Sequence, residues 1–150
     1  MHRELEVFLT MKGVSLKLRG EVYHHCVRSA LLYASETWAV KKEHESKLER
    51  TEMQMVRWMC GVSLKDRRSN EELRRRLGIE SVLVELRRRR LRWFGHVERK
   101  PKEDWVKRCR NMEVEGMRKA GRPRKTWGEV VKEDLRAWGL RAEMAQDMVG

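Results

Sequence analysis

The residues best able to do chemistry in this sequence are arginines concentrated in residues 81–99, SVLVELRRRRLRWFGHVER. A guanidinium group is permanently charged, and its planar N–H donors match phosphate oxygens. At about 100° per residue, Arg88, Arg92 and Arg99 fall on one side of a helix, opposite an apolar arc. The arc comprises Leu83, Leu86, Trp93, Phe94 and Val97. The spacing therefore predicts a helix with one face in a core and the other facing anions.

Arg90 departs from this pattern, because its angle places it inside the apolar arc. An unpaired guanidinium group is costly in such surroundings. The sequence leaves three solutions open: the side chain snorkels to solvent, pairs with a carboxylate, or reaches a phosphate.

A second basic cluster lies at residues 117–127, which contain five cations and no acid. We expect a mobile basic linker here. The tripeptide Gly121, Arg122 and Pro123 also resembles the core of an AT-hook, an extended segment whose arginines enter a narrow minor groove. A plain solvated connector and a nucleic-acid clamp are both open.

The net charge of +12 resides mainly in two stretches, since residues 64–99, which include the predicted arginine-rich helix, carry +6 and residues 117–127 carry +5. Such a distribution favours a polyanion, and the expected partner is RNA, DNA or both. We interpret the arginines as phosphate positioners that do not read bases. The predicted contacts are Arg87, Arg88, Arg92, Arg99, Arg118, Lys119, Arg122, Arg124 and Lys125.

Catalytic constellations are not recognisable in the sequence. Two-metal chemistry needs several converging carboxylates, whereas the aspartates are scattered and are expected to be solvated. They are Asp66, Asp104, Asp134 and Asp147. There is no phosphate-binding glycine loop, nucleophile elbow or H-E-x-x-H motif. We therefore expect no enzymatic activity, no metal and no cofactor.

Histidine and cysteine offer only a weak case for zinc. His96, Cys60 and Cys109 are widely separated and lack a fourth ligand, so a buried, hydrogen-bonded role is expected for His96. The adjacent pair His24 and His25 also lacks a second ligand pair at useful spacing. Three cysteines without a C-x-x-C pair indicate free thiols in a reducing compartment.

The elements that must position these residues are helical, because good helix formers dominate and alternating β-branched runs are scarce. We predict an all-α assembly of about five to six helices with a basic linker before the last. The expected segments are 1–63 (thumb-like), 64–116 (arginine-rich), 117–126 (linker) and 127–150 (amphipathic helix and tail). No signal peptide or membrane span is evident, so an intracellular location, nucleus or cytoplasm, is expected.

Apolar periodicity predicts the inward face of each helix. For a helix over 16–33 the face is Leu18, Val22, Cys26 and Tyr33, followed by a turn that buries Trp38. For 41–60 it is Leu48, Thr51, Met55, Trp58 and Met59. For 103–113 it is Trp105, Val106 and Cys109, and for the last helix Trp127, Val130, Val131, Leu135 and Trp138.

A short helix from Ser69 to Leu77, a turn at Gly78 and the arginine-rich helix resemble a helix-turn-helix. A simple helical hairpin is the alternative. A recognition helix reads bases from its first residues, which here are apolar, so the arginines again look like phosphate contacts.

Several short segments of the sequence together resemble one protein family. They are LLYASETWAV (31–40), ERTEMQMVRWMCGVSLKDR (49–67), LRRRLGIESV (73–82), RLRWFGHVER (90–99) and GRPRKTW (121–127). In this order and at similar spacing, they resemble the region downstream of the polymerase domain in RTE-type non-LTR retrotransposon proteins. One departure is Ala34, where the family usually has glycine, which bears on the local turn geometry.

This resemblance implies the thumb and C-terminal region of an endonuclease and reverse transcriptase, whose catalytic aspartates lie upstream and have no counterpart here. The chain looks like a truncated genomic copy. The implied role is to grip template RNA, target DNA or their hybrid. A structural module that docks on the polymerase domain is the alternative, and in such a complex Arg90 could meet the partner domain.

Overall fold

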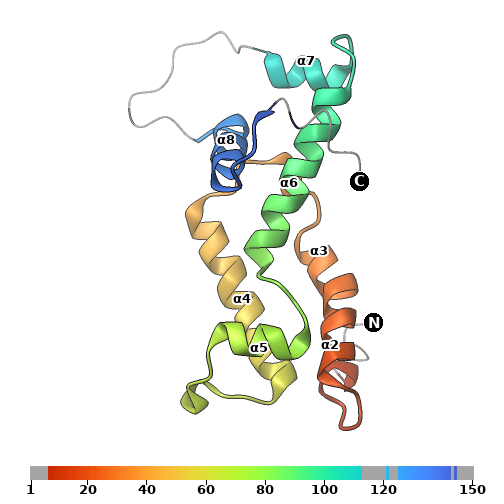
Figure 1. Ribbon diagram of the computed structural model, residues 1–150, viewed down its shortest axis with the longest axis vertical. Coiled ribbons are helices and arrows are strands. Elements are labelled where there is room, and N and C mark those ends of the chain that lie inside the picture. Colours follow the sequence, from red (N-terminus) through yellow and green to blue (C-terminus); the bar gives the residue numbers. More distant parts are fainter. Residues whose placement is uncertain (1–6, 113–120, 122–124, 143, 145–150) are drawn as a thin grey trace. The chain divides into compact units, whose positions relative to one another are not determined.

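Helices and turns make up the described part of the chain, which in this computed structural model comprises residues 7–112, 121, 125–142 and 144 (Figure 1). The longer helices are α2 (Leu16–Val22), α4 (Lys42–Cys60), α5 (Asn70–Leu77), α6 (Val82–Arg99), α7 (Trp105–Asn111) and α8 (Trp127–Ala137). Shorter elements are a π-helical segment (Tyr23–Arg28), α3 (Ser29–Leu31), and two 3-10 turns (Ser35–Thr37 and Leu64–Asp66). The described residues contain no strand, which confirms the all-α prediction.

The chain divides into two compact units. Unit 1 comprises Met1–Tyr33 and Lys42–Leu86, and unit 2 comprises Ala34–Lys41 and Arg87–Gly150. Helix α6 begins in unit 1 and continues in unit 2. None of the helices in the described ranges is long and apolar enough to span a bilayer.

The predicted helix ends are confirmed by their capping contacts. Ser69 Oγ accepts the N–H of Glu72 at 3.1 Å, and Thr126 and Glu129 form a reciprocal capping box. Hydrogen bonds from the backbone N–H and the side chain of Thr126 hold the pKa of the Glu129 carboxyl below its usual range. Gly61 and Gly78 end α4 and α5 with positive φ values of 64° and 68°.

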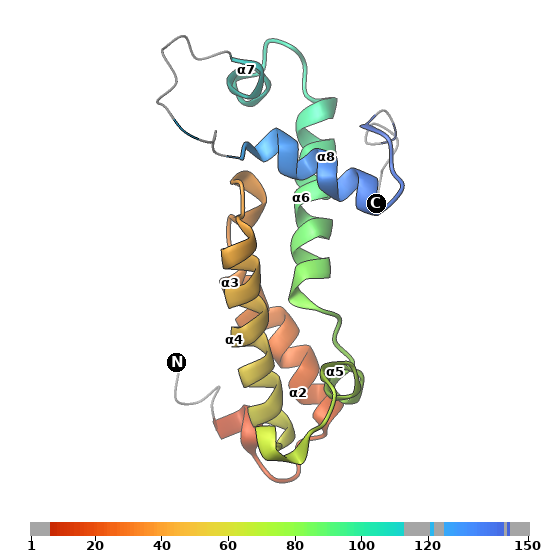
Figure 2. The same ribbon diagram turned by 90° about the vertical axis from the view of Figure 1, so that its left-hand side faces the viewer.

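The core of unit 1 lies where α2, α4 and α5 meet (Figures 1 and 2). Its buried members are Leu9, Tyr23, Met53, Val56, Met59, Leu73 and Leu77. Gly20 allows α2 and α5 to approach closely, because a Cβ atom there would lie 1.9 Å from the carbonyl oxygen of Leu77. A backbone-to-backbone contact of this kind needs glycine.

The predicted inward face of residues 16–33 is correct at Val22, which packs against the core, and wrong at its other three positions. Cys26 is exposed, and Tyr33 and Leu18 are 81% and 44% exposed. The buried positions are instead Gly20, Tyr23, Arg28 and Leu32. Apolar periodicity missed this face because two of its members are a glycine and an arginine, which a hydrophobicity pattern places outside.

The predicted face of α4 is only partly correct. Met59 is buried, but Trp58 is 46% exposed, and Glu52 is fully buried beside Met53 and Val56. Trp38, which belongs to unit 2, was expected to be buried in a turn and is 55% exposed. Trp58 and Trp38 were therefore wrongly assigned to the core. A tryptophan side chain is often only partly buried, so its presence does not identify the buried face of a helix or turn.

Helix α8 crosses α6 in unit 2 (Figure 2), and the two share an apolar cluster. Its buried members are Leu91, Phe94, Val131 and Leu135. The prediction for α8 is confirmed at Val130, Val131 and Leu135, and it is wrong at Trp138, which is 37% exposed. Trp127 is half-buried against Phe94 and donates its indole N–H to the carbonyl oxygen of Glu36 at 2.7 Å.

Helix α7 is shorter than the predicted 103–113, and its expected inward face is wrong at two of its three positions. Trp105 is 73% exposed and Cys109 is exposed, while Val106 is half-buried. The helix is attached through its cations instead. Lys107 donates to the carbonyl oxygen of Glu98 at 2.7 Å, and Arg110 lies over the Phe94 ring with its guanidinium carbon 4.9 Å from the centroid.

Ala34 adopts the left-handed backbone conformation, with φ 57° and ψ 8°. This strain costs a residue with a Cβ atom roughly 1–2 kcal/mol. Ala34→Gly is therefore expected to raise the free energy of unfolding by about 0.5–1 kcal/mol, after the larger backbone entropy of glycine in the unfolded chain is subtracted. Urea titration followed by far-UV circular dichroism measures the change.

The matched control is Ala30→Gly, the same substitution at an exposed position of α3. It is expected to lower the free energy of unfolding by about 0.5–1 kcal/mol, because glycine disfavours an ordinary helix. A loss of stability with both variants would show that Ala34 carries no strain.

Candidate nucleic-acid interface

A basic row runs along one side of α6 in unit 2 and comprises Arg88, Arg92 and Arg99. Arg92 and Arg99 are exposed, and Arg88 is half-buried. Positions three and four residues apart in a helix lie on one face, so these side chains follow one another along the axis. The opposite side of α6 is buried through Phe94 and Val97. The arrangement offers cations to a ligand while the apolar face holds the helix.

His96 was expected to be buried, and this prediction is wrong. Its ring is exposed and stacks on Trp93, with centroids 5.3 Å apart and an interplanar angle of 28°. Trp93 is half-buried at the border between the basic row and the apolar face. The spacing of four residues between Arg92 and His96 was the available signal, since it assigns His96 to the arginine side.

Of the three possibilities that the sequence left open for Arg90, the structure shows pairing with a carboxylate. Its side chain is fully buried, and Nη1 donates to Asp134 Oδ2 of α8 at 2.7 Å. Asp134 is 6% exposed, so the expectation of a solvated carboxylate is wrong at this position. The partner of Arg90 therefore lies within the chain. The apolar surroundings required a carboxylate, and α8 supplies it from 44 residues away.

The predicted phosphate contacts differ in accessibility. Arg87 Nε lies 3.6 Å from Asp134 Oδ1, and Lys125 pairs with Glu133. These two cations already have carboxylate partners within unit 2. Arg92 and Arg99 are exposed on α6. The predicted contacts outside the described residues are Arg118, Lys119, Arg122 and Arg124.

The first residues of α6 are poorly suited to read bases. Val82 is fully buried, and its N–H is donated to Glu52 Oε2 at 2.9 Å. Leu83 and Val84 are half-buried, and the Leu83 N–H is donated to Ser81 Oγ at 3.3 Å. This geometry favours the helical-hairpin interpretation of α5 and α6.

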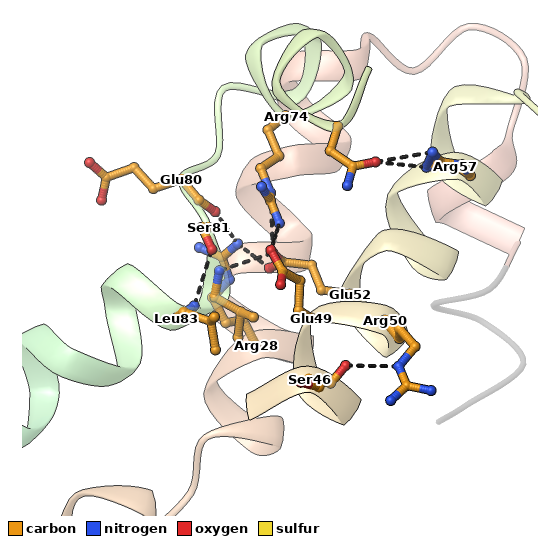
Figure 3. A network of polar contacts seen from close by, with 12 residues as sticks. Arg28, Ser46, Glu49, Arg50, Glu52, Arg57, Arg74, Glu80, Ser81 and Leu83 are labelled. Carbon is orange, nitrogen blue, oxygen red and sulfur yellow. Dashed lines mark hydrogen bonds and ion pairs between the residues drawn. The ribbon is translucent and has the colours of Figure 1, made fainter. Parts of the chain in front are cut away.

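Unit 1 contains a buried polar network centred on Glu52 (Figure 3). The Glu52 carboxylate pairs with Arg28, accepts the hydroxyl of Tyr23 at 3.4 Å, and lies 3.5 Å from Arg74 Nε. Arg28 also donates to the carbonyl oxygen of Glu80 at 2.6 Å. Burial, followed by the charge of Glu52, raises the pKa of Tyr23 to about 12. The network joins α4 to the segment that precedes α6.

The outer side of this network borders a cavity of about 250 Å³ in unit 1. Its lining includes His24, His25, Glu21 and Glu80. Among the described residues, no three histidine, cysteine or acidic side chains are grouped so that they could hold a metal ion. The cavity therefore offers no donor set for metal chemistry.

The cysteines of the chain are free thiols. Cys26 and Cys109 are exposed, and Cys60 is half-buried against the core of unit 1. Burial raises the pKa of the Cys60 thiol. A raised pKa keeps this thiol protonated and poorly nucleophilic.

No protein-family model and no solved structure matches the chain. Over 94 residues the chain is 28% identical to an uncharacterized transposon-derived protein of Caenorhabditis elegans, and the match covers 60% of this chain and 34% of that protein. The chain thus spans about a third of the length of this curated relative. The similarity supports an origin of the chain in a transposable element.

Proposed function

We propose that this chain is a non-catalytic, nucleic-acid-binding segment derived from a retrotransposon reverse transcriptase. It holds template RNA, target DNA or their hybrid through phosphate contacts. The observation that carries the proposal is the basic row of α6, in which Arg92 and Arg99 are exposed along one side of a helix whose other side is buried. A nucleic-acid strand presents regularly spaced phosphates, so a linear array of guanidinium groups complements it.

The charge distribution supports the same proposal. The net charge is +12, and residues 117–127 add five cations to those of α6. The proposed contacts remain the nine cations predicted from the sequence. Among the described ones, Arg92 is favoured because it is exposed, whereas Arg87 and Lys125 must exchange a carboxylate for a phosphate.

The similarity to a transposon-derived protein supports the proposed origin. We assign the chain to the thumb and C-terminal region of an RTE-type reverse transcriptase because the segments around Trp58, Trp93 and Gly121 resemble those of this family. The polymerase chemistry then belongs to other parts of the parent protein, and this segment contributes binding.

Binding to single-stranded RNA, duplex DNA and an RNA–DNA hybrid tests the proposal. Affinity for all three should fall steeply between about 50 and 200 mM salt, because phosphate contacts release counterions. Arg92→Ala should weaken binding about 5-fold at low salt and reduce the salt slope by about 1. The combined variant Arg88→Ala, Arg92→Ala, Arg122→Ala and Arg124→Ala should lose at least about 100-fold.

The matched control is Arg50→Ala, which removes one exposed arginine from α4 without touching the two basic regions. Its affinity should stay within about 2-fold of the wild type, since an isolated surface cation contributes little. Circular dichroism of each variant verifies that the helices persist. Absence of binding to all three ligands at low salt would overturn the proposed function, as would unchanged binding by the combined variant.

A docking module for a polymerase domain is the second candidate, and a specific observation favours it. Trp105, Trp38 and Trp58 are 73%, 55% and 46% exposed. Large exposed apolar side chains commonly mark protein contacts. Co-purification with the polymerase domain of a related element, lost on Trp105→Ala and accompanied by no affinity for nucleic acid, would support this candidate over the first.

A further inference from the structure

The stacked rings of Trp93 and His96 are the feature of unit 2 that phosphate binding leaves unexplained. His96 is exposed on the same side of α6 as the basic row, and its ring stacks on that of Trp93, which is half-buried. A histidine that gains no burial adds little to the core, but its outer ring face remains accessible. The pair therefore presents a flat aromatic surface on an otherwise polar side of α6.

The surroundings of this surface are cationic. One helical turn from His96 lie Arg92 and Arg99, both exposed, and Lys100, which pairs with Asp104 at 2.8 Å. Aromatic rings interleaved with cations are the arrangement by which proteins hold single strands, because the cations follow the backbone and the rings stack on bases. Arginine at this border can also meet a base through its planar guanidinium group.

We propose that Trp93 and His96 form a stacking platform for an unpaired base of single-stranded nucleic acid. The inference rests on the proposed function and deepens it by naming the form of nucleic acid. A duplex keeps its bases stacked inside the helix, so it can meet the cations of α6 but cannot cover the His96 ring. The platform therefore distinguishes unpaired strands from duplexes.

The test compares a fluorescent oligonucleotide of about 12 nucleotides, within the usual site size, as a single strand and as a duplex of the same sequence. His96→Ala is suitable because the side chain is exposed and its loss leaves the core intact. It should weaken single-strand binding about 5-fold or more. Duplex binding and the salt slope for both ligands should stay unchanged, because no phosphate contact is removed.

Two further variants test whether the aromatic ring itself, and not another property of the His96 or Trp93 side chain, is needed for single-strand binding. His96→Phe retains an aromatic face and should restore single-strand affinity to within about 2-fold of the wild type. Trp93→Phe should retain a platform in the same way. In a single strand carrying 2-aminopurine, saturating wild-type protein should quench the probe by stacking, and His96→Ala should not.

The outcomes distinguish this inference from the proposed function. If the wild type binds both ligands with a steep salt dependence but His96→Ala weakens neither or weakens both equally, the stacking platform is wrong and phosphate binding stands. Failure of His96→Phe to restore affinity would also overturn the platform. If the wild type binds neither ligand, the proposed function fails as well. RNA and DNA versions of the single strand show which sugar is preferred.

Discussion

Glu52→Gln is expected to lower the free energy of unfolding of unit 1 by about 3–5 kcal/mol, because it leaves the buried Arg28 without a compensating charge. Glu52 and Arg28 are 0% and 1% exposed, so water cannot replace the lost carboxylate. The substitution preserves the shape of the side chain, and the cost is therefore electrostatic. Urea titration followed by circular dichroism measures the change.

The matched control is Glu49→Gln, one turn earlier on α4. Glu49 pairs with Arg74 at 3.3 Å but is 42% exposed, so its loss should cost at most about 1 kcal/mol. A second variant, Glu52→Gln with Arg28→Met, should recover most of the stability, because it removes the orphaned charge. Equal losses for Glu49→Gln and Glu52→Gln would contradict the role assigned to the buried pair.

The titration of Tyr23 gives an independent measurement of the same network. Burial and Glu52 raise its pKa to about 12, and neutralising Glu52 should lower that pKa toward its ordinary value near 10. Tyr33→Phe leaves Tyr23 as the single phenol of the chain, so phenolate absorbance then reports this residue alone. An unchanged pKa in Glu52→Gln would show that the carboxylate charge does not act on Tyr23.

Asp134→Asn is expected to lower the free energy of unfolding of unit 2 by about 3–5 kcal/mol, because Arg90 is fully buried and pairs with this carboxylate. The hydrogen-bonding capacity of Arg90 is only partly used, because its Nε and Nη2 atoms are buried and have no hydrogen-bond partner among the described residues. The double variant Arg90→Met with Asp134→Leu should therefore be at least as stable as the wild type.

The neighbouring residue of α8 supplies the control. Glu133→Gln removes an exposed carboxylate that pairs with Lys125, and it should cost at most about 1 kcal/mol. Thermal and urea unfolding of the four proteins give the comparison. If Asp134→Asn is no less stable than Glu133→Gln, the Arg90 pair does not hold α8 on α6.

These two pairs bear on the proposed nucleic-acid binding through the basic row of α6. Arg28 and Glu52 anchor the segment before α6 in unit 1, while Arg90 and Asp134 fix α8 against the later turns of α6 in unit 2. Binding by an exposed row needs a rigid helix, because mobile side chains lose more entropy on binding. Variants that loosen either pair should therefore weaken binding indirectly, which is why each binding variant needs a folding control.

Local signals predicted the helices well. Ser69 and Thr126 mark helix starts, and Gly61 and Gly78 mark helix ends, because a cap is a contact between residues a few positions apart. The core face of α6 and the apolar face of α8 were also predictable, since both are strongly amphipathic. The exposed arginines of α6 follow from the same period.

Buried polar residues were not predictable in the same way. Glu52, Arg28 and Asp134 look like solvated residues in any local pattern, and each becomes buried only when a partner 24 or 44 residues away meets it. Gly20 likewise has no signature beyond its lack of a side chain, and its role depends on the approach of Leu77. Such positions depend on tertiary contacts, which periodicity does not contain.

By itself, the sequence determined the all-α class, the helix ends marked by Ser69, Thr126, Gly61 and Gly78, the basic character of residues 81–99 and 117–127, and the conflict posed by Arg90 in an apolar arc. Only the tertiary structure showed that Asp134 neutralises the buried Arg90 and that Glu52 pairs with Arg28. It also showed that the His96 ring stacks on Trp93 and remains exposed to solvent. Periodicity assigns a residue to a face of its own helix. The partner on another helix is chosen by packing, and for a buried charge that partner decides whether the position is stable at all.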